Sequence, residues 1–165
     1  MFILTGHRKS GTSMFHRLFD GHSGINLYPV DISVLYAYFP CFTSNLNLSV
    51  ENLRKRLNIV LKRSLEFHNI EDDKISNFLN EINKKLKDSQ LRNKVSVIRA
   101  IRDSWLEIQQ NDFSLPFVFK ETSQAIFFEE YKEKIPNIKM VALIRDPRDN
   151  YAALKAGVSH YYSKI

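Results

Sequence analysis

The residues whose types and spacing could do chemistry begin in a short loop near the N-terminal end of this 165-residue chain. Gly6 and Gly11 frame the loop, and Thr12 and Ser13 follow it. Loops with this spacing cradle phosphates through successive backbone N–H donors, because glycine permits left-handed backbone and the close approach of an anion. The loop therefore predicts an anion-binding site; the alternative is an ordinary strand-to-helix turn that contains two glycines.

The cations of this loop are not where nucleotide triphosphatases carry theirs. In those enzymes a lysine directly after the second glycine reaches the terminal phosphates, and the next hydroxyl holds magnesium. Here Thr12 occupies the lysine position, and the cations stand earlier, at Arg8 and Lys9. A lysine ahead of the turn can neutralise charge that develops on a leaving oxygen. The pattern therefore favours group transfer without a metal.

A second charged cluster follows an apolar run near the other end of the chain. Residues 140–144 predict a buried strand, and Arg145 comes directly after it. A guanidinium at the end of a strand suits bidentate recognition of a phosphate. Arg148 has acidic neighbours at Asp146 and Asp149, so we expect it to pair with one of them rather than with a ligand.

Together the two clusters resemble sulfotransferases that use 3′-phosphoadenosine 5′-phosphosulfate (PAPS). The segment 6–14, followed by Leu-Phe-Asp-Gly-His at 18–22, is similar to the 5′-phosphosulfate loop and helix of the bacterial and tyrosylprotein branch. The segment 139–149 is similar to the strand and turn that open the 3′-phosphate-binding helix. The resemblance implies a three-layer α/β domain of P-loop type with a central parallel sheet, PAPS as co-substrate and no metal.

The resemblance also implies roles for individual residues. Lys9 corresponds to the cation that assists departure of the sulfuryl group, and Arg145 to the arginine that binds the 3′-phosphate. Where relatives commonly offer a serine to that phosphate, this chain has Ala153, and the loss of one such bond typically costs about 1.5 to 3 kcal/mol. The residues implied to bind the co-substrate are Arg8, Lys9, Ser10, Gly11, Thr12, Ser13 and Arg145; relatives usually have proline at the position of Arg8.

Sulfuryl transfer to a hydroxyl also requires a base, and two carboxylates are candidates. In the tyrosylprotein branch a glutamate follows the second strand, where Asp31 is the nearest carboxylate of this chain. In the cytosolic branch the base ends a lysine-threonine-histidine triplet that aligns with residues 120–122, which makes Glu121 the other candidate. The alternative role of each is a helix cap or a surface acid. The histidines at 7, 16 and 22 show no metal-ligand spacing, so we expect no metal site.

The elements that must position these residues alternate between strands and helices. Apolar runs predict strands at 2–5, 25–28, 117–122 and 140–144, and helical periodicity predicts helices at 12–20, 125–134 and 148–157. Such alternation implies parallel strands, whose ligands lie beyond the carboxyl ends. Gly6, the segment 120–122 and Arg145 all fall at those ends. For the first helix, Met14, Leu18 and Phe19 are the predicted buried face.

Residues 43–112 are predicted to form a helical insertion within a single domain. Its apolar stripes follow helical spacing, with Asp72 or Asp73 predicted to cap the second helix and Asn93 the third. The basic run 54–56 alternates with a leucine stripe, which favours a solvated helix face over a nucleic-acid site. The stripes comprise Leu53, Leu57, Val60, Leu61 and Leu65, then Ile75, Phe78, Leu79, Ile82 and Leu86, then Ile98, Ile101, Trp105 and Ile108.

Composition limits the remaining possibilities. A net charge of +6 suits a nucleotide carrying several phosphate charges, and neither a nucleic-acid motif nor an apolar run of membrane-spanning length is present. The lone Cys41 predicts a cytoplasmic protein. The aromatic residues Tyr36, Tyr38, Phe39 and Phe42 could wall an acceptor pocket or pack beneath a loop. Family members usually extend beyond the last helix, so a partial chain is expected.

The sequence thus predicts a sulfotransferase that moves the sulfuryl group of PAPS to a hydroxyl or amine of an unidentified acceptor, which could be a small molecule, a glycan or a peptide. Two alternatives remain at this stage. One is a small-molecule kinase that binds ATP through the same loop. The other is a nucleotide-binding remnant without catalytic activity.

Overall fold

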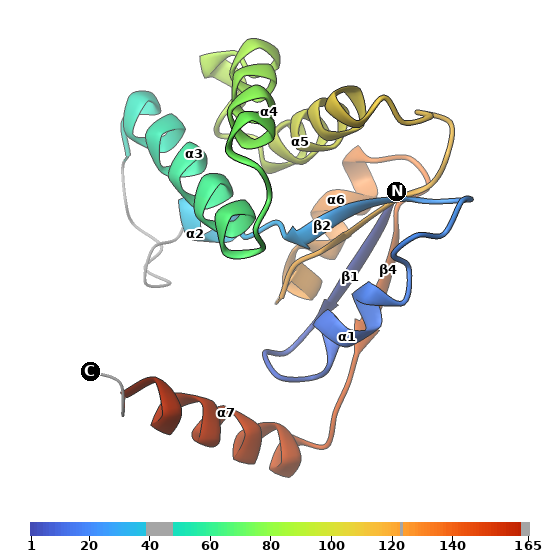
Figure 1. Ribbon diagram of the computed structural model, residues 1–165, viewed down its shortest axis with the longest axis vertical. Helices are drawn as coiled ribbons and strands as arrows, with labels where there is room; N and C mark the ends of the chain where they lie inside the picture. The colour runs from blue at the N-terminus through green and yellow to red at the C-terminus, as the bar shows by residue number, and fades with distance from the viewer. Residues whose placement is uncertain (39–47, 123, 163–165) are drawn as a thin grey trace.

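A parallel sheet organises the chain, as the computed structural model shows for residues 1–38, 48–122 and 124–162 (Figure 1). For 158–162 only the backbone is described, and Phe39, Cys41 and Phe42 lie outside the described residues. The strands are β1 (Phe2–Gly6), β2 (Asn26–Asp31), β3 (Phe117–Lys120) and β4 (Lys139–Leu143), in the order β2-β3-β1-β4. All neighbouring strands pair in parallel, so the predicted α/β class is confirmed.

Helices lie on both faces of this sheet, in the arrangement of a three-layer P-loop-type domain (Figure 1). Three of them, α3 to α5, connect β2 to β3, within the region predicted to be a helical insertion. The helices are α1 (Thr12–Arg17), α2 (Leu35–Tyr38), α3 (Val50–Phe67), α4 (Asp72–Lys85), α5 (Lys94–Gln109), α6 (Phe128–Lys134) and α7 (Pro147–Tyr162). Short 3-10 turns, η2 (Asp88–Gln90) and η3 (Gln124–Phe127), precede α5 and α6.

Strand β2 continues beyond the strand predicted at 25–28. Pro29 lies inside β2, and the register with β3 shifts between Leu27 and Asp31. An edge strand tolerates proline because the missing N–H is not needed by a second neighbour. The extension places Asp31 inside the sheet, beside Lys120 at the end of β3.

One face of the sheet is packed. Ile3, Tyr28 and Phe119 are fully buried on this face, within the core that α3 to α6 complete. Trp105 of α5 contacts the ring of Tyr28 edge-on at a centroid distance of 5.2 Å, and Phe78 of α4 at 5.5 Å. The leucine stripe of α3 is buried as predicted, at positions 53, 57, 61 and 65.

The opposite face carries α1 and is more open. Phe15 and Phe19 stack edge-on at 5.4 Å and line an apolar cavity of about 250 Å³ together with strand residues such as Leu4 and Val141. The prediction for this helix was wrong in two respects. The helix ends at Arg17, and its buried residues are Thr12 and His16, whereas Met14 and Leu18 are each 71% exposed. A helix this short rests on the sheet along one i, i+4 pair only.

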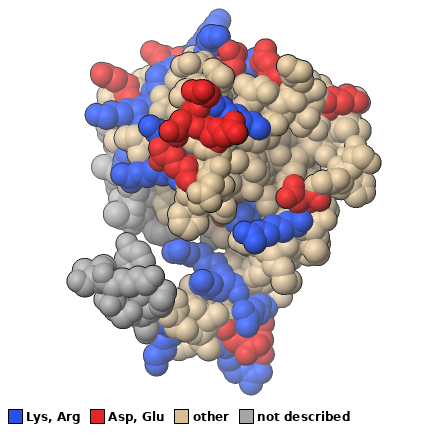
Figure 2. Space-filling model, viewed as in Figure 1, with Lys and Arg blue, Asp and Glu red and all other residues tan. Residues whose placement is uncertain are grey.

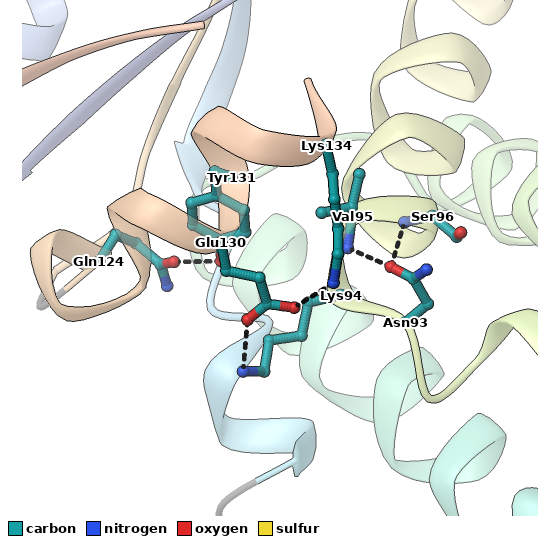
Figure 3. Close-up of polar contacts among 8 residues, drawn as sticks. All are labelled: Asn93, Lys94, Val95, Ser96, Gln124, Glu130, Tyr131 and Lys134. Carbon is teal, nitrogen blue, oxygen red and sulfur yellow. Dashed lines mark hydrogen bonds and ion pairs between the residues drawn. The ribbon is translucent and has the colours of Figure 1, made fainter. Parts of the chain in front are cut away.

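The second and third helices of the insertion begin at different kinds of residue. Asn93 caps α5 as predicted, because its side-chain oxygen accepts hydrogen bonds from the backbone N–H groups of residues 95 and 96 (Figure 3). For α4 the predicted caps were wrong: the N-cap is Glu71, and Asp72 and Asp73 lie in the first turn, where their charges favour the helix dipole.

Polar contacts join α5, α6 and η3 to β1, the strand that leads into the loop framed by Gly6 and Gly11. Lys94 of α5 and Lys134 of α6 both contact Glu130, at 3.5 and 3.1 Å (Figure 3). Tyr131 donates a hydrogen bond of 2.5 Å to the side chain of Gln124 (Figure 3). The backbone N–H of Gln124 in turn donates to Thr5 Oγ1 at 3.0 Å, which fixes the end of β1 against η3.

Candidate functional site

The loop between β1 and α1 folds as a compact turn with two left-handed residues. The N–H of Ser10 donates to the carbonyl of His7 at 3.1 Å. Lys9 has a φ of 66° and Gly11 a φ of 98°. A left-handed lysine costs about 1 to 2 kcal/mol relative to ordinary backbone, so surrounding contacts must hold it there. We refer to residues 6–11 as the glycine loop.

Gly6 is required at its position by close approach. A Cβ atom there would lie 2.6 Å from Ser10 Oγ and 2.7 Å from the carbonyl oxygen of Leu143 in the neighbouring strand. Any larger residue would push the loop away from β4. Ser10 Oγ is itself buried, and in the described part of the chain it has no hydrogen-bond partner. A hydroxyl in this state can donate to a bound anion, which is the behaviour that a phosphate cradle requires.

Two side-chain donors, one from the turn after β4 and one from α7, hold the carbonyls of this loop. Arg145 Nη1 donates to the carbonyl of Lys9 at 3.1 Å, and Asn150 Nδ2 donates to the carbonyl of Arg8 at 2.8 Å. The two motifs at opposite ends of the sequence are therefore in direct contact. Arg145 is exposed, so the other N–H groups of its guanidinium remain open to a ligand. Lys and Arg side chains gather over this part of the surface (Figure 2).

The side chain of Lys9 is exposed and runs along α7. A Cβ atom on Gly157 would lie 3.3 Å from Lys9 Cε and 3.6 Å from its Nζ, so a small residue on α7 leaves room for the lysine. Ala153, the residue that replaces the expected serine, is half-buried on the same helix. Arg148 pairs with Asp146 at 2.7 Å, as predicted.

A second group of side chains lies at the ends of β2 and β3, on the α1 face of the sheet. Lys120 Nζ forms an ion pair with Asp31 Oδ2 at 3.0 Å and donates to Ser13 Oγ at 3.1 Å. Ser64 of α3 fixes this end of β2 by donating to the backbone carbonyl of Asp31 at 2.6 Å. We call Ser13, His16, Asp31 and Lys120 the Lys120 cluster. Of the two candidate bases, Asp31 is the one beside residues that follow the glycine loop.

Glu121, the other candidate base, faces away from this cluster. Successive residues of an extended segment point to opposite faces, so Lys120 reaches α1 while Glu121 turns into the core. It is 2% exposed, and its Oε1 accepts a hydrogen bond from the backbone N–H of Leu35 at 3.0 Å. Burial, and then the charge of Asp31, raise the pKa of this carboxyl well above its usual range. The structure thus places Glu121 at the start of α2 and not at the loop.

His16 belongs to the Lys120 cluster and was not singled out by the sequence. It is 3% exposed, and its Nε2 has no partner within the described residues. Burial, followed by the charge of Lys120, lowers the pKa of His16 to about 4. The sequence signal for its burial was its position four residues after Thr12, because residues with this spacing lie on the same side of a helix. Asn150 was also missed, because nothing local shows which carbonyl its side chain meets.

The described residues contain no group of three or more His, Cys, Asp or Glu side chains that could hold a metal. Across residues 1–38, 48–122 and 124–162, no helix has both the length and the apolar composition that a membrane span requires. No protein-family model, no curated protein and no solved structure matches this chain. The geometry of the glycine loop, Arg145 and the Lys120 cluster is therefore what indicates the function of this chain.

Proposed function

We propose that this protein is a sulfotransferase that transfers the sulfuryl group of PAPS to a hydroxyl or amine of an acceptor. The observation that carries the proposal is the contact between the glycine loop and Arg145. A loop suited to one phosphate and a guanidinium suited to another lie side by side, joined by the 3.1 Å bond to the carbonyl of Lys9. A nucleotide with phosphates at its 5′ and 3′ positions needs two neighbouring anion sites of this kind.

In this proposal the backbone N–H groups of Lys9 and of the segment 11–13 bind the 5′-phosphosulfate, with the hydroxyls of Thr12 and Ser13, while the N–H of Ser10 stays bonded to the carbonyl of His7. The loop itself supplies the donors, since α1 is too short to add much of a helix dipole. The acceptor oxygen attacks sulfur in line, the bond from sulfur to the bridging phosphate oxygen breaks, and that oxygen keeps the electron pair. Lys9 stabilises the negative charge that develops there, and Arg145 holds the 3′-phosphate.

Asp31 is the residue that we propose as the acceptor's base. It shares a face of the sheet with Ser13 and with α1, and about a quarter of its side chain is exposed, at 25%. The ammonium of Lys120, 3.0 Å from Asp31 Oδ2, holds this carboxylate beside Ser13. Glu121 does not support this role, because its carboxyl is buried at the start of α2.

Two observations favour the alternative of nucleotide binding without transfer. Asp31 is already engaged by Lys120, and Ala153 offers no hydroxyl to the 3′-phosphate. A kinase is less consistent with the loop, since Thr12 stands at the position of the phosphate-binding lysine and is 4% exposed. The lone cysteine supports a cytoplasmic location for this activity.

The decisive experiment combines a transfer assay with a binding assay. Transfer of radiolabelled sulfate from PAPS is measured against small-molecule, glycan and peptide acceptors, and binding of 3′-phosphoadenosine 5′-phosphate (PAP) is measured by calorimetry. We expect one PAP per chain, and transfer that falls when Lys9→Met is tested but not in the matched variant Lys155→Met on the exposed face of α7. PAP binding without transfer supports the non-catalytic alternative. Magnesium-dependent binding of ATP without binding of PAP would overturn the proposal.

A further inference from the structure

We propose that Asn150 is a positioning residue for the glycine loop, a role that depends on the loop being the nucleotide site proposed above. Asn150 lies in the first turn of α7 and is 7% exposed, although the residues around it in sequence are exposed. Its backbone N–H continues the helix by donating to Asp146 at 2.9 Å. The helix fixes the backbone of Asn150, and its side-chain Nδ2 donates a hydrogen bond of 2.8 Å to the carbonyl of Arg8.

The consequence of that bond follows from peptide geometry. In a trans peptide unit the C=O and N–H groups point in opposite directions, and the described chain contains no cis bond. Holding the carbonyl of Arg8 against α7 thus aims the N–H of Lys9 away from that helix. Arg145 holds the next carbonyl in the same way, so two successive peptide units of the loop are fixed from outside.

These two bonds also account for the unusual backbone of Lys9. Its φ of 66° is unfavourable for a lysine, and the peptide units on both sides of it are those held by Asn150 and Arg145. Without the bond from Asn150, the Arg8–Lys9 peptide unit can rotate and turn a carbonyl oxygen towards the anion. A carbonyl in place of an N–H repels a phosphate, so the loss of one remote bond weakens the anion site.

The chain contains a matched control for this bond. Asn26 is 4% exposed, and its Nδ2 likewise donates to a backbone carbonyl, that of Asp112, at 2.6 Å. It lies at the amino end of β2, at the opposite edge of the sheet from the glycine loop. Asn150→Ala and Asn26→Ala therefore remove the same kind of buried bond, one at the loop and one far from it.

The test compares both variants with the wild type by amide hydrogen exchange and by PAP calorimetry. We expect faster exchange at the amide of Ser10, which donates within the loop, and PAP binding about tenfold weaker in Asn150→Ala. Asn26→Ala should leave both readouts at the wild-type level. Asn150→Leu, which keeps the shape but cannot donate, should behave like Asn150→Ala.

The outcomes separate this inference from the proposed function. If Ser10 exchange or PAP affinity in Asn150→Ala matches that of Asn26→Ala, the positioning role is overturned. If the wild type binds no PAP, the proposed function fails, and Ser10 exchange alone decides whether Asn150 orders the loop. If Asn150→Ala does not fold, the Leu variant, which retains the side-chain volume, provides the same comparison.

Discussion

The Lys120 cluster and the glycine loop lie at the same edge of the sheet but satisfy their charges differently. In the cluster, Lys120 is 9% exposed and its ammonium is bound to Asp31 and Ser13. Around the loop, Lys9 and Arg145 are exposed, and neither forms an ion pair with any described carboxylate. The charges of the Lys120 cluster are thus paired within the protein, whereas the positive charges of Lys9 and Arg145 remain available to a ligand.

This difference separates two physical tasks. A cation paired inside the protein contributes mainly to the stability and shape of the edge, because its attraction is already used. Exposed cations held by backbone carbonyls keep their charge for an incoming anion and raise its local concentration. Substitution of Lys120 should therefore change stability, and substitutions around the glycine loop should change ligand binding.

The largest effect is expected for Lys120→Met. This substitution leaves the carboxylate of Asp31 without its partner at 3.0 Å and should lower the free energy of unfolding by about 3 kcal/mol. Urea unfolding at pH 7 measures it. The double variant Lys120→Met/Asp31→Asn should recover part of the loss, since it removes the unpaired charge. A double variant no more stable than the single one would show that the ion pair is not what stabilises this edge.

His16 should make the stability of the protein depend on pH. Because its pKa is about 4 in the folded state and 6.5 in the unfolded state, the unfolded chain takes up a proton first as the pH falls. The neutral imidazole therefore contributes stability above pH 6.5 that is lost between pH 6.5 and 4, about 3 kcal/mol in total.

His16→Asn tests this dependence, since asparagine keeps a short polar side chain that does not titrate. We expect the free energy of unfolding of the variant to fall less than that of the wild type between pH 6.5 and 4. Chemical unfolding at several pH values gives both curves. Parallel curves would mean that the imidazole is protonated in the folded state or exchanges with water more freely than its burial indicates.

Much of the fold could be predicted from the sequence because local patterns decide it. Alternating strands and helices fixed the parallel sheet, the leucine spacing fixed the buried stripe of α3, and Asn93 alone marked the start of α5. The errors arose where tertiary packing decides. The buried side of α1 depends on how two turns of helix rest on the sheet, and β2 continues through Pro29 only because it is an edge strand.

The site was predictable to the level of its motifs but not of its contacts. The spacing of Gly6 and Gly11 and the position of Arg145 after a strand placed both at one edge, as the structure shows. Strand alternation predicts that the side chains of Lys120 and Glu121 point to opposite faces of the sheet. Which of the two contacts α1 depends on the order of the strands. The bond from Asn150 to the carbonyl of Arg8 joins residues 142 positions apart and leaves no local signal.

The next largest effect is expected at the exposed cations around the glycine loop. Arg145→Met removes a guanidinium proposed to bind the 3′-phosphate, and PAP affinity should fall by roughly 10- to 100-fold, the usual loss for a bond to a charged group. The free energy of unfolding should change little, in contrast to Lys120→Met. Calorimetry and urea unfolding on the same preparation measure both quantities. A large loss of stability with unchanged affinity would reverse the roles assigned to the two regions.

The smallest effect is expected for Arg148→Met. This variant tests whether the loss of affinity in Arg145→Met comes from a lost contact or from a lost charge. Arg148 carries the same charge three positions from Arg145, but its guanidinium already forms a two-pronged pair with Asp146 at 2.7 and 3.1 Å. Removing it subtracts one positive charge without subtracting a ligand contact, so PAP affinity should change by about twofold or less at physiological salt. If Arg148→Met weakened PAP as much as Arg145→Met does, the total charge of this surface, and not the contact between Arg145 and the glycine loop, would decide anion binding.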